Sequence, residues 1–218
     1  MKTNIVIPVK NPSSAKQRLA EALTATQREE LALVLFDHLL STLFPADGYH
    51  VLIVTDSAKI ESLAALRGAE VLRESQSRGE TAAVEEATRW SVRNGFDRQL
   101  VIPGDMPCVT RDDIRFLLGQ PMTPPEVILT PAVGDDGTNA ILSAPPDVLT
   151  FRFGARSFPD YVEQMRRKNV RCRIVRMENM VLDLDTPEDL SAFLALDRDL
   201  PARRLILGWN LDKQSIAR

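Results

Sequence analysis

The sequence has few of the residues on which several common protein classes depend. Of its 218 residues, two are cysteines, Cys108 and Cys172, and two are histidines, His38 and His50. Two distant cysteines give neither a disulfide framework nor the paired spacing of a zinc site, so a reducing cytoplasm is expected. Two histidines, one in an apolar helical pattern and one at a strand start, are too few for a histidine-rich metal centre and are expected to be structural.

Excess charge and long apolar runs are also lacking. The 27 Lys and Arg against 30 Asp and Glu give a net charge of −3, which provides no general attraction for nucleic acid or an anionic membrane. The most apolar stretch, 31–44, is interrupted by Asp37 and His38 and is too short to span a bilayer. The opening apolar run is closed by Pro8 and Lys10 and is too short for a signal peptide. We therefore expect a soluble protein that is not exported.

The glycine pattern excludes two large nucleotide-binding classes. The ten glycines include no G-x-G pair, so the dinucleotide-binding fingerprint is absent. The phosphate loop G-x-x-x-x-G-K-[ST] is absent as well. A dehydrogenase of the usual type and a P-loop kinase are therefore disfavoured.

Short β-rich runs alternate with helical patterns along the chain, which indicates an α/β fold with a mostly parallel sheet. A single domain over 1–218 is expected, with 197–218 as a tail whose apolar cluster Leu205–Trp209 would cover the sheet edge or a partner subunit. The expected strands are Asn4–Val9, His50–Thr55, Ala69–Leu72, Gln99–Ile102, Val127–Thr130, Ala140–Leu142, Val170–Arg176 and Met180–Leu184.

Capping signals mark the expected helices. A Ser or Thr followed three residues later by an acidic residue predicts a helix start, and a glycine after an apolar pattern predicts its end. The expected helices are one after the Thr26/Glu29 capping box, one from Ser57 to Arg67, Glu80–Asn94, Asp112–Leu118 behind Thr110, and Pro187 to about Leu196 behind Thr186.

The first chemical signal follows the opening strand, where IPVK leads into NPSSAKQRLA. In a parallel sheet, ligands bind beyond the carboxyl ends of the strands, so this loop would place Lys10, Lys16 and Arg18 at a ligand site. Three cations there would suit the phosphates of a nucleotide. The alternative is that Lys16 and Arg18 are solvated helix residues.

The second signal is PGDMP, after the fourth expected strand. Asp105 would lie at the ligand-facing end of that strand, in a turn where Gly104 permits close approach. Such a carboxylate suits a hard divalent ion such as Mg²⁺. The alternative is an ordinary Gly-Asp turn, or a carboxylate that accepts hydrogen bonds from nearby amides. Cys108 lies close by without a histidine to activate it and is expected to be a bystander.

The third signal is LDLDTPEDL. Alternation along a strand would point Asp183 and Asp185 to the same side, where they could complete a metal site with Asp105. Asp185 could also belong to the cap region of the next helix, and Glu188 and Asp189 would complement the dipole of that helix.

The fourth signal is a pair of small-residue stretches, DDGTNA around Thr138 and FRFGARSF around Gly154 and Ser157. Hydroxyls and free backbone amides there could wrap a phosphate or carboxylate without a large cation. The Asp136-Gly137 pair would equally suit a hairpin turn.

Together, these signals describe a cationic phosphate loop, aspartates for a divalent ion and a small pocket for a second anion. No strong nucleophile or dedicated base accompanies them. The combination suits nucleotidyl transfer, because an acceptor phosphate already carries the attacking oxyanion. Such a reaction needs charge neutralisation and in-line positioning, which a metal and Lys or Arg can supply.

The ordered motifs IPVK…AKQRLA, PGDMP, GTNA, FRFG..SF and LDLDTPEDL, over residues 5–190, resemble the guanylyltransferases of deazaflavin coenzyme F-420 biosynthesis, the 2-phospho-L-lactate guanylyltransferase group. The resemblance implies a single-domain fold like that of nucleotide-diphospho-sugar transferases, with a mixed, mostly parallel sheet flanked by helices. It also implies a reaction of GTP with a phosphorylated three-carbon acid that releases pyrophosphate.

The resemblance implies roles for individual residues. Asp105 and Asp185 match the metal-binding aspartates, expected to hold Mg²⁺, with Asp183 in support. Three positions match those that hold the phosphate and carboxylate of the acceptor: Thr138, Gly154 and Ser157. Three positions match the loop that faces the GTP phosphates: Lys10, Lys16 and Arg18. The expected catalytic residues are Lys10, Lys16 and Asp105.

The sequence departs from the family pattern in SRGETAAVEEA, where many relatives have a leucine-asparagine pair after the glycine and this chain has Glu80-Thr81. That turn is expected to help hold the nucleotide, although Glu80 could only cap its helix.

Members of this group use 2-phospho-L-lactate, phosphoenolpyruvate or 3-phospho-D-glycerate, and phosphoenolpyruvate is our first expectation here. Two alternative functions remain: a molybdopterin or sugar-phosphate nucleotidylyltransferase of the same fold, and a non-catalytic nucleotide-binding protein. The first usually opens with a glycine-rich loop that PVKNPSSAKQR lacks. A homodimer is a further expectation.

Overall fold

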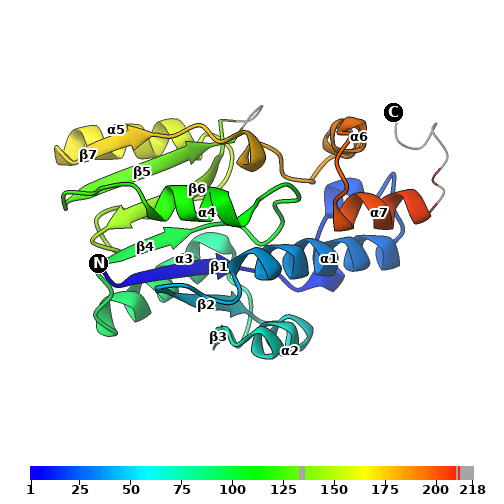
Figure 1. Cartoon of the computed structure of the whole chain (residues 1–218), viewed down its shortest axis with the longest axis horizontal. Coiled ribbons are helices and arrows are strands. Elements are labelled where there is room, and N and C mark those ends of the chain that lie inside the picture. Colours follow the sequence, from blue (N-terminus) through cyan, green and yellow to red (C-terminus); the bar gives the residue numbers. More distant parts are fainter. Residues whose placement is uncertain (133–135, 210, 212–218) are drawn as a thin grey trace.

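A computed structural model describes residues 1–132, 136–209 and 211. Its centre is a seven-stranded sheet with the strand order β3-β2-β1-β4-β6-β5-β7 (Figure 1). All neighbouring strands run parallel except β6, which is antiparallel to both β4 and β5. The strands are β1 (Thr3–Pro8), β2 (Tyr49–Thr55), β3 (Glu70–Arg73), β4 (Arg98–Val101), β5 (Glu126–Pro131), β6 (Thr138–Ala144) and β7 (Arg171–Ile174).

The sheet confirms seven of the eight expected strands, and Met180–Leu184 is wrong. That segment follows β7 in the chain and pairs with no described strand. Its apolar residues are buried by packing against other elements rather than by pairing in the sheet. Met180 packs in the core between sheet and helices, and Leu184 packs against the helices at the end of the molecule.

Helices connect the strands and cover both faces of the sheet. They are α1 (Ala25–Leu43), α2 (Ala58–Arg67), α3 (Glu80–Arg93), α4 (Arg111–Leu118), α5 (Ser157–Lys168), α6 (Pro187–Ala195) and α7 (Pro201–Gly208), with 3-10 turns η1 (Pro12–Ser14), η2 (Gln17–Leu19) and η3 (Glu178–Met180). Among the described residues, no helix has the length and apolar character needed to cross a membrane.

The helix signals succeeded except at one start. Thr110 and Thr186 each form the expected capping box, and Gly68 ends α2 in the left-handed conformation. The box that opens α1 is Thr24/Gln27 rather than Thr26/Glu29, because the Gln27 side chain accepts from the Thr24 backbone amide at 2.9 Å. Helices α5 and α7 were not anticipated.

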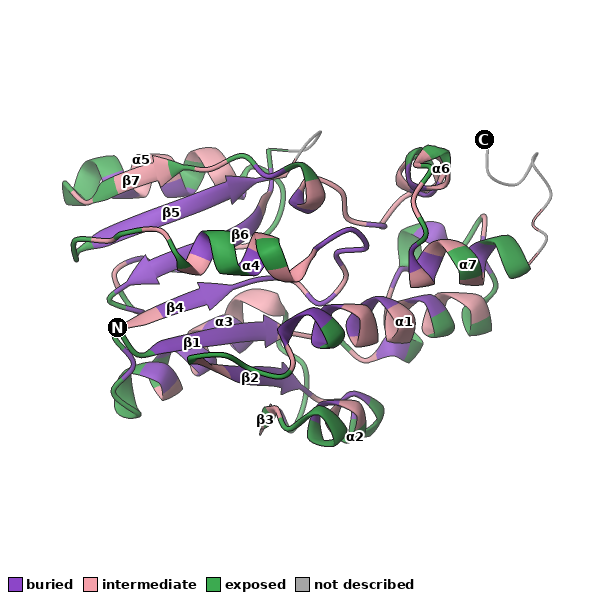
Figure 2. Ribbon diagram, viewed as in Figure 1, coloured by how far each residue is buried: buried purple, intermediate pink, exposed green. Residues whose placement is uncertain are grey.

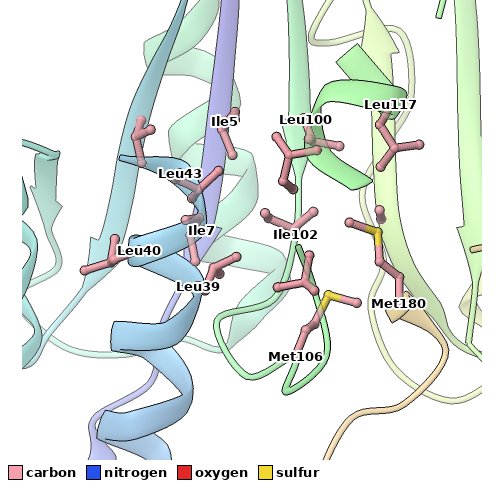
Figure 3. Packing of buried hydrophobic residues seen from close by; sticks show 14 of the residues in the cluster. Ile5, Ile7, Leu39, Leu40, Leu43, Leu100, Ile102, Met106, Leu117 and Met180 are labelled. Atoms are coloured by element: carbon pink, nitrogen blue, oxygen red, sulfur yellow. The ribbon is translucent and has the colours of Figure 1, made fainter. Parts of the chain in front are cut away.

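Alternation along β1 sends neighbouring side chains to opposite faces, and each face has its own core. Ile5 and Ile7 pack with α1, α2 and α4. Figure 3 shows this cluster with labelled residues of α1 and α4. Val6 packs on the other face, with α3 and α5. The central strands are therefore buried on both sides, which explains their largely apolar sequences, whereas the edge strands β3 and β7 are partly exposed (Figure 2).

A third apolar cluster lies beyond the carboxyl ends of the strands, where α6 and α7 pack on α1 (Figure 1). Ile206 of the expected tail cluster is buried there against Leu31 and Leu35. Helix α7, in the described part of the expected tail, therefore covers α1 of its own chain rather than the sheet edge. This packing also places the segment before α6 opposite the end of β4.

Candidate functional site

A cavity of about 520 Å³ opens at the carboxyl ends of the central strands. Its walls come from the loops after β1, β3 and β4, the first turns of α3 and α5, the start of β6 and the segment before α6. All nine residues singled out in the sequence line it: Lys10, Lys16, Arg18, Asp105, Thr138, Gly154, Ser157, Asp183 and Asp185. The structure thus brings five separate segments to one site, and the roles of these residues remain predictions.

Lys16 lies at the centre of the acidic side of the cavity. Its Nζ atom donates to Oδ2 of Asp105 at 2.6 Å and to Oδ1 of Asp185 at 2.9 Å. The side chain is 3% exposed, so Lys16 is not the solvated helix residue of the alternative interpretation, whereas Arg18 is exposed. A left-handed backbone at Lys16, with φ of 54°, turns the chain between η1 and η2 and aims the lysine inward.

This arrangement favours the charged forms of Lys16 and Asp185. Burial acts to lower the pKa of Lys16, but the two carboxylates outweigh it and raise that pKa well above its ordinary value. Burial acts to raise the pKa of Asp185, but Lys16 outweighs it, and the pKa lies below its usual range. The cavity therefore holds a fixed cation between two fixed anions.

Gly104 allows Asp105 to take this position. A Cβ atom there would lie 3.0 Å from Cγ2 of Val9, which is tighter than ordinary side-chain contacts. The absence of a side chain lets the turn after β4 approach β1 closely. The carboxylate that follows can then reach the loop after β1.

The acidic side of the cavity supplies some, but not all, of the ligands that a divalent cation needs. Asp105 and Asp185 supply oxygens that already converge on one cationic position, and Mg²⁺ is often held by one or two carboxylates together with substrate phosphates. Within the described chain, no three His, Cys, Asp or Glu side chains are grouped closely enough to hold a metal. The donor set therefore suits an ion whose remaining ligands come from a bound phosphate.

Asp183 lines the cavity without a strand to orient it. Burial and the charges of Asp105 and Asp185 raise its pKa to about 6. Residues 182–185 form no strand, and the backbone amide of Asp185 donates to Oδ2 of Asp189, in the α6 capping box, at 3.2 Å. Asp185 therefore serves as a cavity residue and as part of the approach to α6.

A pocket of hydroxyls lies at the other side of the cavity. Oγ of Ser157 donates to Oγ1 of Thr138 at 3.1 Å, which joins the first turn of α5 to the start of β6. Gly154 and Arg156 have φ of +122° and 67°, and these values turn the chain into the helix. Two hydroxyls beside the positive end of a helix dipole can bind a small anion.

Two glutamates of the cavity wall, Glu74 and Glu80, are not among the nine residues singled out in the sequence, although the turn that contains Glu80 was expected to help hold the nucleotide. Glu80 opens α3 and faces the acidic side, where burial and the charge of Asp105 raise its pKa to about 7, against the effect of Lys10. Glu74 directly follows β3, and Asp105 lies in the loop after β4. Its position after a strand was therefore the one sequence signal that could have identified Glu74 as a cavity residue. Its neighbour in the wall, Gly79, precedes α3 with φ of +92°.

The histidines and Cys108 lie outside the cavity lining, as expected. Nε2 of His38 lies 3.0 Å from the backbone oxygen of Val109, and His50 stacks on Trp90. Cys108 is buried in the α6/α7 cluster. These side chains support the fold.

Comparison with known proteins agrees with this geometry. The family model described as "Guanylyl transferase CofC like" matches residues 3–206. A 3-phospho-D-glycerate guanylyltransferase from Colwellia psychrerythraea is 39% identical over 90% of this chain and 93% of its own. A phosphoenolpyruvate guanylyltransferase from Rubrobacter xylanophilus is 34% identical (85% and 90%), and a 2-phospho-L-lactate guanylyltransferase from Methanothermobacter thermautotrophicus is 28% identical (94% and 90%).

The fold has relatives among solved structures. A crystal structure described as a nucleotide-diphospho-sugar transferase from Desulfovibrio desulfuricans superposes with a TM-score of 0.79 over 99% of this chain and 97% of its own, at 20% identity. The expected fold class is thereby confirmed. With a family model that spans nearly the whole described chain and relatives up to 39% identical, the chain belongs to the CofC-like guanylyltransferases.

Proposed function

We propose that this chain transfers GMP from GTP to the phosphate of a three-carbon phospho-acid and releases pyrophosphate. The observation that carries the proposal is the shared cavity, which combines Lys16 between Asp105 and Asp185 with the hydroxyl pocket of Thr138 and Ser157. One side suits a triphosphate with a cation, and the other suits a small second anion. The proposed pathway is coenzyme F-420 biosynthesis, as the family resemblance implies.

The reaction requires two bond changes at one phosphorus atom. An oxygen of the acceptor phosphate attacks the α-phosphorus of GTP, a new P–O bond forms, and the bond to the β-phosphate oxygen breaks. The acceptor oxygen is already anionic, so no base has to remove a proton. This agrees with a cavity whose cationic and acidic groups include no histidine.

Each group in the cavity has a proposed task. Lys16 offsets charge on the α-phosphate, while Lys10 and Arg18, both exposed at the rim, attract the β- and γ-phosphates. Asp105 and Asp185 would hold Mg²⁺, which when bound neutralises phosphate charge and helps pyrophosphate leave. Ser157 and Thr138 orient the acceptor acid so that its phosphate faces the nucleotide.

The acceptor is one of three acids that differ by a hydroxyl or a double bond. The 39% identical relative is named for 3-phospho-D-glycerate, and the 34% identical relative is named for phosphoenolpyruvate. These similarities put 3-phospho-D-glycerate beside phosphoenolpyruvate as the first acids to test. 2-Phospho-L-lactate completes the set.

An acceptor screen tests the proposal directly. The purified chain is incubated with GTP, Mg²⁺ and each acid, pyrophosphate release is followed, and the product mass is measured. We expect a guanosine-diphospho acid with at least one of the three. Activity with CTP or a sugar phosphate, without activity for GTP and any three-carbon acid, would reject the proposal in favour of another nucleotidyltransferase.

A further inference from the structure

Glu74 is a buried carboxylate whose hydrogen bonding the fold leaves incomplete. The residue is 8% exposed, and its Oε1 atom is fully buried without a hydrogen-bond partner among the described residues. Its backbone amide donates to the oxygen of Thr55 at 2.9 Å, which fixes the residue at the end of β3. An unsatisfied buried acceptor is destabilising, so such a group in a cavity wall points to a ligand that donates hydrogen bonds.

The surrounding charges do not pair with Glu74. Burial and the negative charges of Glu86 and Asp56 raise its pKa, and Arg78 acts in the opposite direction. Arg78 is itself bound to Glu86 at 2.7 Å, and in the described chain Glu74 forms no ion pair of its own. Among the described residues, no group therefore matches this carboxylate, which leaves it available to a ligand.

The sheet order separates Glu74, at the end of β3, from Asp105, after the end of β4. Strands β2 and β1 separate β3 from β4, so the ends of β3 and β4 lie roughly 14 Å apart. The wall between them includes the apolar residues Val9, Val54 and Ala83. Gly79 leaves open space where a side chain would stand. A flat ring can lie on such a surface while its polar edge reaches the carboxylate.

Glu80 has a different position from Glu74. The charges that act on Glu80 are those of Asp105, Lys10, Asp185 and Asp183, all of which belong to the phosphate end of the cavity. None of these charges is among those that act on Glu74. The two glutamates therefore lie at different parts of the cavity wall, Glu80 beside the acidic side and Glu74 away from it.

We propose that Glu74 selects the base of the nucleotide by accepting hydrogen bonds from N1–H and the N2 amino group of guanine. This rests on the proposed function, which takes GTP as the donor nucleotide. Guanine presents two adjacent donors on this edge, which match two carboxylate oxygens in a charge-assisted pair. Adenine and cytosine present a ring acceptor beside their amino group, and uracil presents one N–H between two carbonyls.

Nucleotide binding to wild type and Glu74→Gln tests this assignment. Titration calorimetry with Mg²⁺ and no acceptor would compare GTP, ITP, ATP and 2′-deoxy-GTP. We expect wild type to bind GTP roughly 10- to 100-fold more tightly than ITP, which lacks the N2 amino group. In Glu74→Gln the side-chain amide can donate to N1 of adenine and accept from the adenine amino group. We therefore expect this variant to bind GTP more weakly and ATP more tightly than wild type, so that the ratio of GTP to ATP affinity falls about 100-fold.

The controls separate base recognition from other roles. Glu86→Gln removes a neighbouring carboxylate that lies outside the cavity lining and should keep the GTP/ATP preference. Equal affinity of wild type for GTP and ITP would overturn the assignment without any variant. An unchanged GTP/ATP preference in folded Glu74→Gln would also overturn it. The assignment would also be overturned if Glu74→Gln bound GTP more weakly than wild type but bound 2′-deoxy-GTP as tightly as wild type. That pattern would indicate that Glu74 contacts the ribose 2′-hydroxyl rather than the base.

The same titrations distinguish this assignment from the proposed function. A wild-type chain that does not bind GTP contradicts both. A chain that binds GTP with the expected preference but transfers GMP to none of the three acids supports the role of Glu74 and contradicts the proposed reaction.

Discussion

The Nζ atom of Lys16 lies 2.6 Å from Oδ2 of Asp105, although 89 residues separate them in the chain. The contact exists because β1 and β4 are neighbours, so the loops that follow them meet at one edge of the sheet. Asp185 reaches the same lysine from a third segment. A cation that holds two carboxylates together gives the cavity its charge pattern before any substrate binds.

Replacing Lys16 should slow nucleotide transfer but strengthen the binding of Mg²⁺ in the absence of nucleotide. In Lys16→Met we expect kcat to fall about 100- to 1,000-fold, because charge neutralisation at the α-phosphate is lost. The freed aspartate pair should bind Mg²⁺ alone, so Mg²⁺ without nucleotide should raise the melting temperature of this variant more than that of wild type. Lys59→Met, at an exposed lysine paired with Glu29, is the control. Equal Mg²⁺ effects in wild type and Lys16→Met would contradict this prediction.

Asp105 should matter for turnover more than for nucleotide binding. In Asp105→Asn we expect GTP to bind weakly and Mg²⁺-dependent turnover to fall about 100-fold or more, since one of two carboxylate ligands is lost. Steady-state rates over a Mg²⁺ titration and calorimetry with GTP measure the two effects. Asp112→Asn, whose carboxylate is 92% exposed, should behave as wild type. Unchanged turnover in Asp105→Asn would refute the metal assignment.

Ser157 should act on the acceptor acid. Ser157→Ala removes one of the two hydroxyls that lie 3.1 Å apart, so we expect the KM for the acid to rise about tenfold while the KM for GTP changes little. Ser62→Ala, an exposed hydroxyl on α2, is the matched control. A rise in the KM for GTP without one for the acid would place Ser157 on the nucleotide side instead.

Glu80 should reduce stability at alkaline pH. Its pKa of about 7 lies above the value of 4.5 for an ordinary glutamate, so ionisation of this carboxyl opposes folding. The loss is absent below pH 4.5, grows as the pH rises and is complete above pH 7. After allowance for solvent screening, Glu80→Gln should raise the free energy of unfolding by about 2 kcal/mol at pH 8.

Urea unfolding at pH 5 and pH 8 measures this difference. Glu85→Gln on the same helix controls for the loss of a carboxylate outside the cavity lining. The same stability change in Glu80→Gln at both pH values would show that the burial of Glu80 does not affect its titration.

Much of the fold could be predicted because local signals agreed with the tertiary structure. The apolar runs predicted strands that are buried on both faces, and Thr110, Gly68 and Thr186 marked helix boundaries correctly. Met180–Leu184 failed because an apolar extended run is also what a segment needs to pack between helices without pairing. Helix α5 was missed because the left-handed turn at Arg156 gives no capping signal in the sequence.

The sequence by itself determined the chemistry of the site: the cations after β1, the aspartates of PGDMP and LDLDTPEDL, and the hydroxyls of Thr138 and Ser157. Only the tertiary structure decided that Lys16 is buried between Asp105 and Asp185 and that Glu74 lies across two strands from β4 without a partner for its buried oxygen. Residue types follow from the sequence, whereas burial and pairing depend on which strands become neighbours. Strand order arises from packing across the whole sheet, which no local pattern specifies.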